Sequence, residues 1–304
     1  MFASQELNHF AQQHHLEGLC EQTVLSLKEG AYQLDRVEAF RRFYKKIENE
    51  LLTHPIIKKN DYCDWFQQGD ATQAQVRQFL IQFSVFSNQF LIAQLHKMLN
   101  AETLEEMRAS KEILANEIGV IFNGSKATHI ADKDMEGDPE MVSIDGSVDG
   151  GLFRFRAAHF EWLLKMGEKL DLSFGQMGKR RHATKSTLFF CNELIRLYGS
   201  DAYQTSAAAS YAVENWAAAG FWDQLVEGFV RFKSNANMPE LPLAFFTWHS
   251  KIEANHAHHT REELEEYYFT HDVDEETFID DGYEMLDGVK AFWEGLNQAR
   301  QARH

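Results

Sequence analysis

The sequence predicts an all-α protein. Only four prolines interrupt its 304 residues, and apolar residues recur at helical spacing over most of the chain. No segment alternates convincingly with the two-residue period of a half-buried strand. The 18 glycines are densest between residues 119 and 176, so we expect long helices on either side of that region.

The helices can be placed in order along the chain. We expect an N-terminal helical extension over residues 1–32, followed by one domain over residues 33–304 that begins with a helix at about 33–53. Thr72 with Gln75, and Thr103 with Glu106, match the capping-box pattern and open helices near 73–99 and 104–118. The same apolar spacing predicts helices at 153–168, 184–198, 203–232, 241–268 and 275–298, the last with Asp274 as its N-cap.

One segment does not fit a helix. Residues 120–151, "VIFNGSKATHIADKDMEGDPEMVSIDGSVDGG", are rich in Gly, Asp and Ser, which predicts a long loop, a lid or a small hairpin. We interpret the segment as an insertion in the helical domain. Because it joins two of the candidate ligands discussed below, we expect it to lie over or beside the mouth of their site.

Composition excludes several classes of partner. A formal charge of −16 disfavours nucleic acid and anionic membrane surfaces, since both require clustered Lys and Arg. No apolar run is long enough to span a bilayer, and the N-terminus lacks the pattern of a signal peptide, so a cytoplasmic location is expected. Cys20, Cys63 and Cys191 are far apart and odd in number, which predicts reduced thiols.

The stretch "TWHSKIEANHAHH" contains a candidate metal-binding face. His249, Glu253 and His256 are spaced i, i+4 and i+7, so their side chains leave one face of the expected helix. Imidazole and carboxylate together suit Fe, Mn or Zn. A polar stripe is the alternative, because a motif of this kind arises by chance in roughly one in ten chains of this composition.

Glu214 is a second acidic candidate. It lies in "SAAASYAVENWAAAGFW", where the neighbouring turns carry Ala and aromatic residues. Burying an unpaired carboxylate costs several kcal/mol, so a metal or an ion pair is needed to keep it charged. No Lys or Arg stands three or four residues away, which favours the metal over an ordinary ion pair on the helix face.

Several ordered motifs resemble one known superfamily. They are "LLTHPIIKK", "QFLIQFSVFSNQF", "ILANEIG", "FRAAHFEWLLKMG", the helix of Glu214, the H-x3-E-x2-H helix and "DGYEMLDGVKAFWEGL". In this order they are similar to the heme-oxygenase-like oxidases and oxygenases, relatives of TenA and PqqC that include the chlamydial protein associating with death domains. The resemblance runs from about residue 50 to 297 and implies a heme-oxygenase-like (TenA-like) helical bundle.

The resemblance also implies a site. Members that resemble this chain bind two irons, with manganese as the alternative, through ligands that correspond here to Glu117, His159, Glu214, His249, Glu253 and His256. Family members have only a short link between the first two ligands, whereas the insertion separates them here, so His96 and His182 stay open as substitutes for His159. The resemblance gives Glu214 and Glu253 the catalytic roles of bridging and shifting ligand.

The implied activity is oxygen activation. Substrates would be O2 and a small amino-acid-like or fatty-acid molecule, undergoing oxidative cleavage, desaturation or decarboxylation; a homodimer stays open. N-oxygenating relatives carry an additional carboxylate where this chain has Gln89, which disfavours that reaction. Two other classes remain: a TenA-like hydrolase with Cys191 as nucleophile, and a non-catalytic helical protein that binds through Phe- and Trp-rich grooves.

Overall fold

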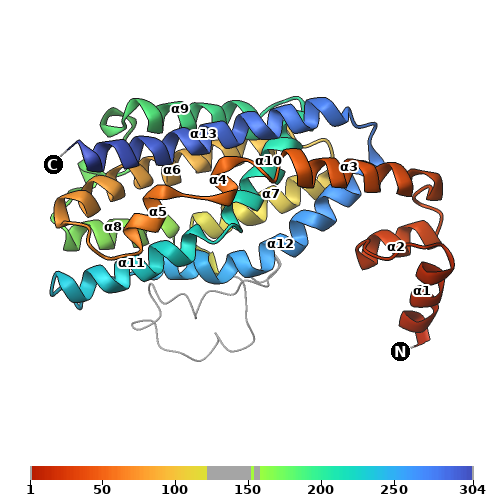
Figure 1. Ribbon diagram of the computed structural model, residues 1–304, viewed down its shortest axis with the longest axis horizontal. Coiled ribbons are helices and arrows are strands. Elements are labelled where there is room, and N and C mark those ends of the chain that lie inside the picture. Colours follow the sequence, from red (N-terminus) through yellow and green to blue (C-terminus); the bar gives the residue numbers. More distant parts are fainter. Residues whose placement is uncertain (1, 122–151, 154–157, 303–304) are drawn as a thin grey trace.

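The prediction of an all-α protein is confirmed by the structure, a computed structural model that describes residues 2–121, 152–153 and 158–302 (Figure 1). The first half of the chain forms α1 (Phe2–Gln13), α2 (Glu21–Lys28), η1 (Leu34–Arg36), α3 (Val37–Glu50), α4 (Pro55–Lys58), α5 (Asp61–Phe66), α6 (Gln73–Leu99), α7 (Leu104–Glu117) and strand β1 (Val120–Ile121). The second half forms strand β2 (Leu152–Phe153), α8 (His159–Lys169), η5 (Phe174–Gln176), η6 (Arg180–His182), α9 (Lys185–Glu193), η7 (Leu194–Tyr198), α10 (Tyr203–Ala217), α11 (Phe221–Asn235), α12 (Ala244–Thr270) and α13 (Glu275–Gln301).

Side-chain caps begin the long helices where the sequence predicts them. Thr72 and Thr103 each accept a hydrogen bond from the backbone N–H three residues later, and each forms a reciprocal capping box. Asp274 caps α13 by accepting from the N–H of Thr277. These caps satisfy backbone donors that have no partner inside the helix, which fixes where each helix begins.

The helix predicted over residues 203–232 is wrong as a single element. The chain breaks it into α10 and α11 at Gly220, whose φ of +93° only glycine adopts readily. Trp216 and Phe221 stack across the break with ring centroids 4.5 Å apart. The last turn of the helix predicted at 184–198 also differs, because residues 194–198 form the π-helix η7.

The long helices pack side by side around an aromatic core. α13 lies against α9 and α10, α6 against α7 and η7, and α11 against α12 (Figure 1). Phe79 and Phe83 of α6 meet Phe246 of α12 with centroids 6.0 and 5.5 Å away, and both contact Trp293 of α13. Burial of these large rings stabilises the packing of α12, which carries His249, against α6 and α13.

The N-terminal helices lie at one end of the molecule, where α2 contacts α12 and α1 contacts α2 (Figure 1). The backbone N–H of Cys20 donates to Oε2 of Glu265 at 2.9 Å, and Arg261 pairs with the other oxygen of the same carboxylate at 2.6 Å. Glu265 is fully buried, so both partners are needed to keep its charge satisfied. The carboxylate therefore ties the extension to the last third of the chain.

The two ends of the predicted insertion meet. β1 and β2 pair antiparallel, with Val120 opposite Phe153 and Ile121 opposite Leu152. Residues 122–151, which hold most of the insertion, lie outside the described residues, so its expected place at the mouth of the site stays a prediction. Within the described residues, none of the helices combines the length and the apolar composition that crossing a bilayer requires.

His54 ties the start of α4 to α13 and makes stability depend on pH. Its Nδ1 accepts from the N–H of Ile56 at 3.2 Å, and its Nε2 lies 3.2 Å from Oδ1 of Asp287. Only 1% of the residue is exposed. Burial lowers the pKa of His54 below its ordinary value of 6.5, although Asp287 acts in the opposite direction.

The free energy of unfolding is expected to fall as the pH drops below about 6.5, because the unfolded chain then binds a proton that the folded chain still excludes. The free energy of unfolding stops falling on this account once the pH is below the pKa of His54 in the folded protein. Urea unfolding at about pH 7.5 and at about pH 5.5 measures this decrease in the free energy of unfolding. His54→Asn keeps a capping oxygen but does not titrate, so its loss should be smaller; an equal loss would exclude His54 as the cause.

Candidate metal centre

Glu117, His159 and His249 come together from three helices. One potential ligand atom from each lies within 4.8 Å of the other two. Glu117 is the last residue of α7, His159 the first of α8, and His249 stands in the second turn of α12. One carboxylate and two imidazoles are a ligand set that Fe, Mn and Zn accept.

The local backbone explains how Glu117 and His159 meet although 41 residues separate them in the sequence. Gly119, at φ +98°, ends α7 and turns the chain into β1. The pairing of β1 with β2 then returns the chain to the same place, a few residues before α8 begins. The insertion therefore leaves the geometry of this pair intact.

His159 is buried, with Nδ1 in an ion-pair contact with Glu117 and no hydrogen-bond partner for Nε2 among the described residues. Only 1% of the residue is exposed, and neither ring nitrogen has a hydrogen-bond partner among the described residues. Nδ1 lies 3.0 Å from Oε1 of Glu117, but the pair is a close contact without hydrogen-bond geometry. Leaving a buried polar atom such as Nε2 without a partner costs about 1–3 kcal/mol, a cost that a cation bound to this nitrogen would relieve.

Charge within the triad keeps Glu117 ionised. Burial by itself would raise the pKa of Glu117, but the positive charge that His159 and then His249 can carry outweighs burial and lowers this pKa. The carboxylate is thus in the deprotonated form that binds a cation. It keeps 12% of its side chain exposed.

The backbone orients His249. Its Nδ1 lies 2.6 Å from the carbonyl oxygen of Phe245, one turn earlier in α12. A carbonyl only accepts, so Nδ1 carries the hydrogen, and in the neutral ring Nε2 keeps its lone pair. A hydrogen bond of this kind fixes the tautomer of many metal-binding histidines.

Aromatic rings enclose both imidazoles. The ring centroid of His159 lies 4.2 Å from that of Trp248 and 5.1 Å from that of Trp162. His249 stacks on Trp222 with ring centroids 4.5 Å apart. All three tryptophans are nearly fully buried. Such walls exclude water and lower the local dielectric, which strengthens electrostatic interactions at the triad.

The other ligands predicted from the sequence are not among the three residues of the triad. Glu253 and His256 follow His249 by one and two turns on α12, but their side chains lie outside the described residues. Glu214 is half buried on α10 and is not one of the triad. After burial itself, its charge is the largest influence that raises the pKa of the Tyr198 phenol.

The two substitute histidines do not enter the triad. His96, on α6, and His182, in η6, are both exposed, and the ring of His182 contacts the carbonyl of Gly175. Gln89 is buried and accepts a hydrogen bond from Arg180 at 2.9 Å, so it serves a structural contact. His159 is therefore the histidine that the structure places beside Glu117.

Cys191 lacks the character of a nucleophile. It is fully buried on α9, and burial raises the pKa of its thiol to about 12 although Arg180 lowers it slightly. A thiol with such a pKa stays protonated at neutral pH, whereas a cysteine nucleophile reacts as the thiolate. This observation disfavours the hydrolase alternative.

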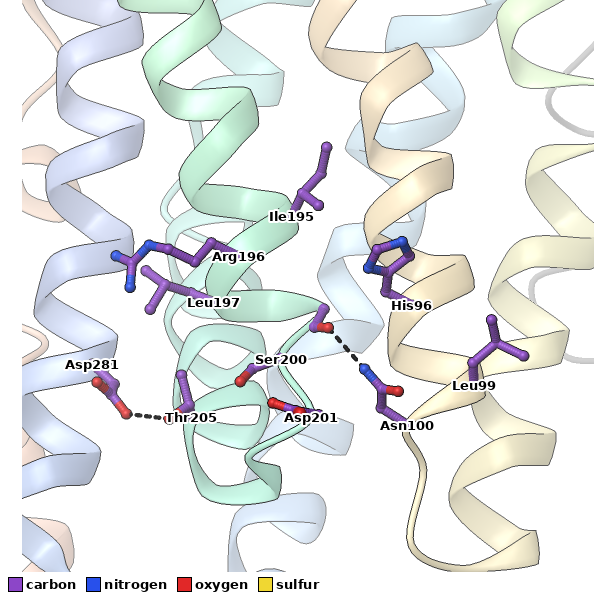
Figure 2. A pocket seen from close by; sticks show the side chains of 11 residues that line it. His96, Leu99, Asn100, Ile195, Arg196, Leu197, Ser200, Asp201, Thr205 and Asp281 are labelled. Atoms are coloured by element: carbon purple, nitrogen blue, oxygen red, sulfur yellow. Dashed lines mark hydrogen bonds between the residues drawn. The ribbon is translucent and has the colours of Figure 1, made fainter.

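A surface hollow of about 780 Å³ lies elsewhere in the fold (Figure 2). The end of α6, η7, the start of α10 and one residue of α13 line it. Asn100 closes one side by donating to the carbonyl of Gly199 at 3.1 Å, and Thr205 donates to Asp281 at 2.7 Å on the other. Its lining includes no residue of the triad, so the hollow is separate from the candidate metal centre.

Comparison with known proteins identifies the fold. No protein-family model and no curated protein matches the sequence. Among solved structures, the chain is similar to the crystal structure of a domain of unknown function with a heme oxygenase-like fold from Shewanella denitrificans. The two share a TM-score of 0.54 and 12% identity over 86% of this chain and 93% of that chain. The chain therefore has a heme oxygenase-like fold, as its sequence predicts.

Proposed function

We propose that this protein is a metal-dependent oxidoreductase that activates O2 at a pair of irons, with manganese as the alternative metal. The observation that carries this proposal is the buried triad, in which both ring nitrogens of His159 lack a hydrogen-bond partner among the described residues. Nε2 of this buried imidazole has no hydrogen-bond partner among the described residues, and a bound cation would satisfy it. The residues present therefore fit a metal.

Ligands for the pair can be assigned to residues of this chain. Glu117, His159 and His249 would hold one metal, and His256 the other, with Glu214 as bridge and Glu253 free to change its mode of binding. Three carboxylates would offset most of the four positive charges of two ferrous ions. When bound, the irons supply open coordination positions and the electrons that O2 requires.

The protein's own residues prepare the site. Nδ1–H of His249 donates to the carbonyl of Phe245, which makes Nε2 the nitrogen that carries the lone pair in the neutral ring. Glu117 stays ionised between the two imidazoles, so it requires no proton loss on binding a cation. Trp162, Trp222 and Trp248 keep bulk water from the two rings, as a site for reactive oxygen chemistry requires.

We further propose a small amino-acid-like or fatty-acid substrate that undergoes oxidative cleavage, desaturation or decarboxylation. Gln89 is neutral and is held by Arg180, so it offers no additional anionic ligand of the kind that N-oxygenating relatives carry. No described residue identifies the product. The substrate class therefore rests on the resemblance and on the absence of an acid at this position.

Glu214→Ala is expected to lower the bound iron and to abolish any optical change triggered by O2, while the helix tolerates the substitution because Ala has the highest helix propensity. The measurement is anaerobic loading with Fe(II), metal counting, and absorption spectroscopy after O2 is added. Glu227→Ala is the control, because Glu227 lies half exposed on α11 and pairs with Arg231. Full iron content, an unchanged reaction with O2 and a more stable fold in Glu214→Ala would show that this acid is not a ligand.

A further inference from the structure

Ring contacts link the six tryptophans of this chain, in part through His249, Phe221 and Tyr62. All six lie on different helices, and only Trp65, on α5, is more than a few per cent exposed. Trp162, Trp222 and Trp248 contact the imidazoles of the triad, whereas Trp293 contacts Tyr62 of α5. The series therefore begins at the candidate metal centre and ends at the surface.

Each step of this series is a contact between neighbouring rings. Centroid distances are 4.5 Å from His249 to Trp222, 4.6 Å from Trp222 to Phe221, and 5.5 Å from Phe221 to Trp293. The series continues for 5.7 Å from Trp293 to Tyr62 and 5.3 Å from Tyr62 to Trp65. We call this line of rings the aromatic path: His249, Trp222, Phe221, Trp293, Tyr62 and Trp65.

We propose that the aromatic path carries single oxidising equivalents from the candidate metal centre to Trp65, where a reductant in solution removes them. The inference rests on the proposed function, because the metal centre is the source of the oxidising equivalent. An oxygen-activating site that reacts without substrate would otherwise oxidise its own ligands. The path leads that oxidising power away from the ligands and ends at Trp65 on the surface.

The lack of hydrogen-bond acceptors among the described residues for the buried indoles of the path keeps the oxidising equivalent mobile. Indole is the side chain of this path that loses an electron most readily. Within the described part of the chain, the buried Nε1–H groups of Trp222 and Trp293 have no hydrogen-bond partner, so an oxidised indole there cannot pass its proton to an acceptor. The charge then stays on the ring and can move to the next one.

Phe221 and Tyr62 act as bridges between the tryptophans. Phe221 carries no group that is easily oxidised. Burial raises the pKa of the Tyr62 phenol well above its ordinary value, so this side chain keeps its proton and is hard to oxidise. The oxidising equivalent therefore rests on Trp222, Trp293 and Trp65 in turn.

Trp65 is suited to be the end of the path. It is partly exposed, and the guanidinium of Arg300 lies 4.4 Å above its ring. This cation disfavours positive charge on the indole, so oxidised Trp65 should lose its Nε1 proton to water. A thiol or ascorbate then returns one electron and one proton. In total the metal centre gains one electron, and the reductant loses one electron and one proton.

Packing alone could also produce a line of rings, because 13% of the residues are aromatic. The two explanations differ in what happens to Trp65. A core that only packs gives no link between chemistry at the triad and oxidation at the surface. The aromatic path requires that link, and it requires each tryptophan along it.

The test treats Fe(II)-loaded protein with limiting hydrogen peroxide, without substrate, and maps oxidised tryptophan by peptide mass spectrometry. We expect Trp65 to be oxidised above the metal-free control. Trp293→Phe, and Trp222→Phe if it still binds iron, should reduce oxidation of Trp65 to the metal-free level. Trp216→Phe is the matched control, since Trp216 is equally buried and stacks on Phe221 but leaves the 5.5 Å contact of Phe221 with Trp293.

Two results of this test would overturn the inference: Trp65 equally oxidised in Trp293→Phe and in the wild type, or wild-type protein that binds iron without oxidation of Trp65 above the control. A protein that binds no iron contradicts the proposed function instead. The path is then decided in metal-free protein with a ruthenium tris-bipyridine photo-oxidant and persulfate. Oxidation of buried Trp222 should be lost in Trp65→Phe and in Trp293→Phe; equal oxidation of Trp222 in these variants and the wild type would refute the path.

Discussion

His159→Ala is expected to abolish the stabilisation of this protein by Fe(II). A ligand that binds only the folded chain stabilises it by RT ln(1 + [L]/Kd), about 2.7 kcal/mol at a hundredfold excess over Kd. His159 is buried beside Glu117, and both of its nitrogens lack a hydrogen-bond partner among the described residues. Thermal unfolding with and without anaerobic Fe(II), together with metal counting, should show the shift in the wild type and none in the variant.

The two exposed histidines that the sequence leaves open as substitutes are the controls for this experiment. His96→Ala and His182→Ala remove the same ring from α6 and η6, outside the triad. Both variants should keep the iron-dependent shift. If His159→Ala retains the full shift and the full iron content, the triad is not the metal centre, and the proposal that rests on it fails.

Gly228→Ala is expected to destabilise the packing of α11 against α5. A Cβ at this position of α11 would lie 2.6 Å from Cδ1 of Phe66 and 2.9 Å from its carbonyl carbon. Because part of the obstacle is backbone, α5 and α11 must move apart. Overpacking of this kind costs about 1–3 kcal/mol, and we expect the upper end of that range in urea unfolding.

Gly175→Ala is the matched control for the packing prediction. A Cβ there would meet only ordinary contacts, 3.7 Å to Arg181 and 3.9 Å to Ser173. Its free energy of unfolding should stay within about 0.5 kcal/mol of the wild type. Equal stability of Gly228→Ala and Gly175→Ala would mean that α5 and α11 are packed less closely than the structure shows.

Helix positions follow from the sequence wherever short-range signals determine them. Thr72, Thr103 and Asp274 begin their helices as predicted, because a cap depends on residues three positions apart. The break at Gly220 is harder to predict, since the alanines before it favour helix and the stacking of Trp216 on Phe221 across the break is a tertiary contact. The helix α4 depends on His54, whose second partner, Asp287, is far along the chain.

In the candidate site, too, some features follow from the sequence and others depend on tertiary contacts. Glu117, His159 and His249 are named from the sequence, and the structure places them together. The pairing of β1 with β2 that makes this possible is only two residues long, too short for a period to reveal. The aromatic walls also escape the sequence, because Trp162, Trp222 and Trp248 come from three helices and look like ordinary core residues.

The pairing of β1 with β2 has a consequence for how such a protein can diverge. The chain departs at Ile121 and returns at Leu152, and these two residues are partners across the ladder. Mutations that lengthen, shorten or exchange the segment between them therefore leave the helix ends at Glu117 and His159 in register. Because longer loops cost little in closure entropy, the length of this segment can change without displacing the ligands.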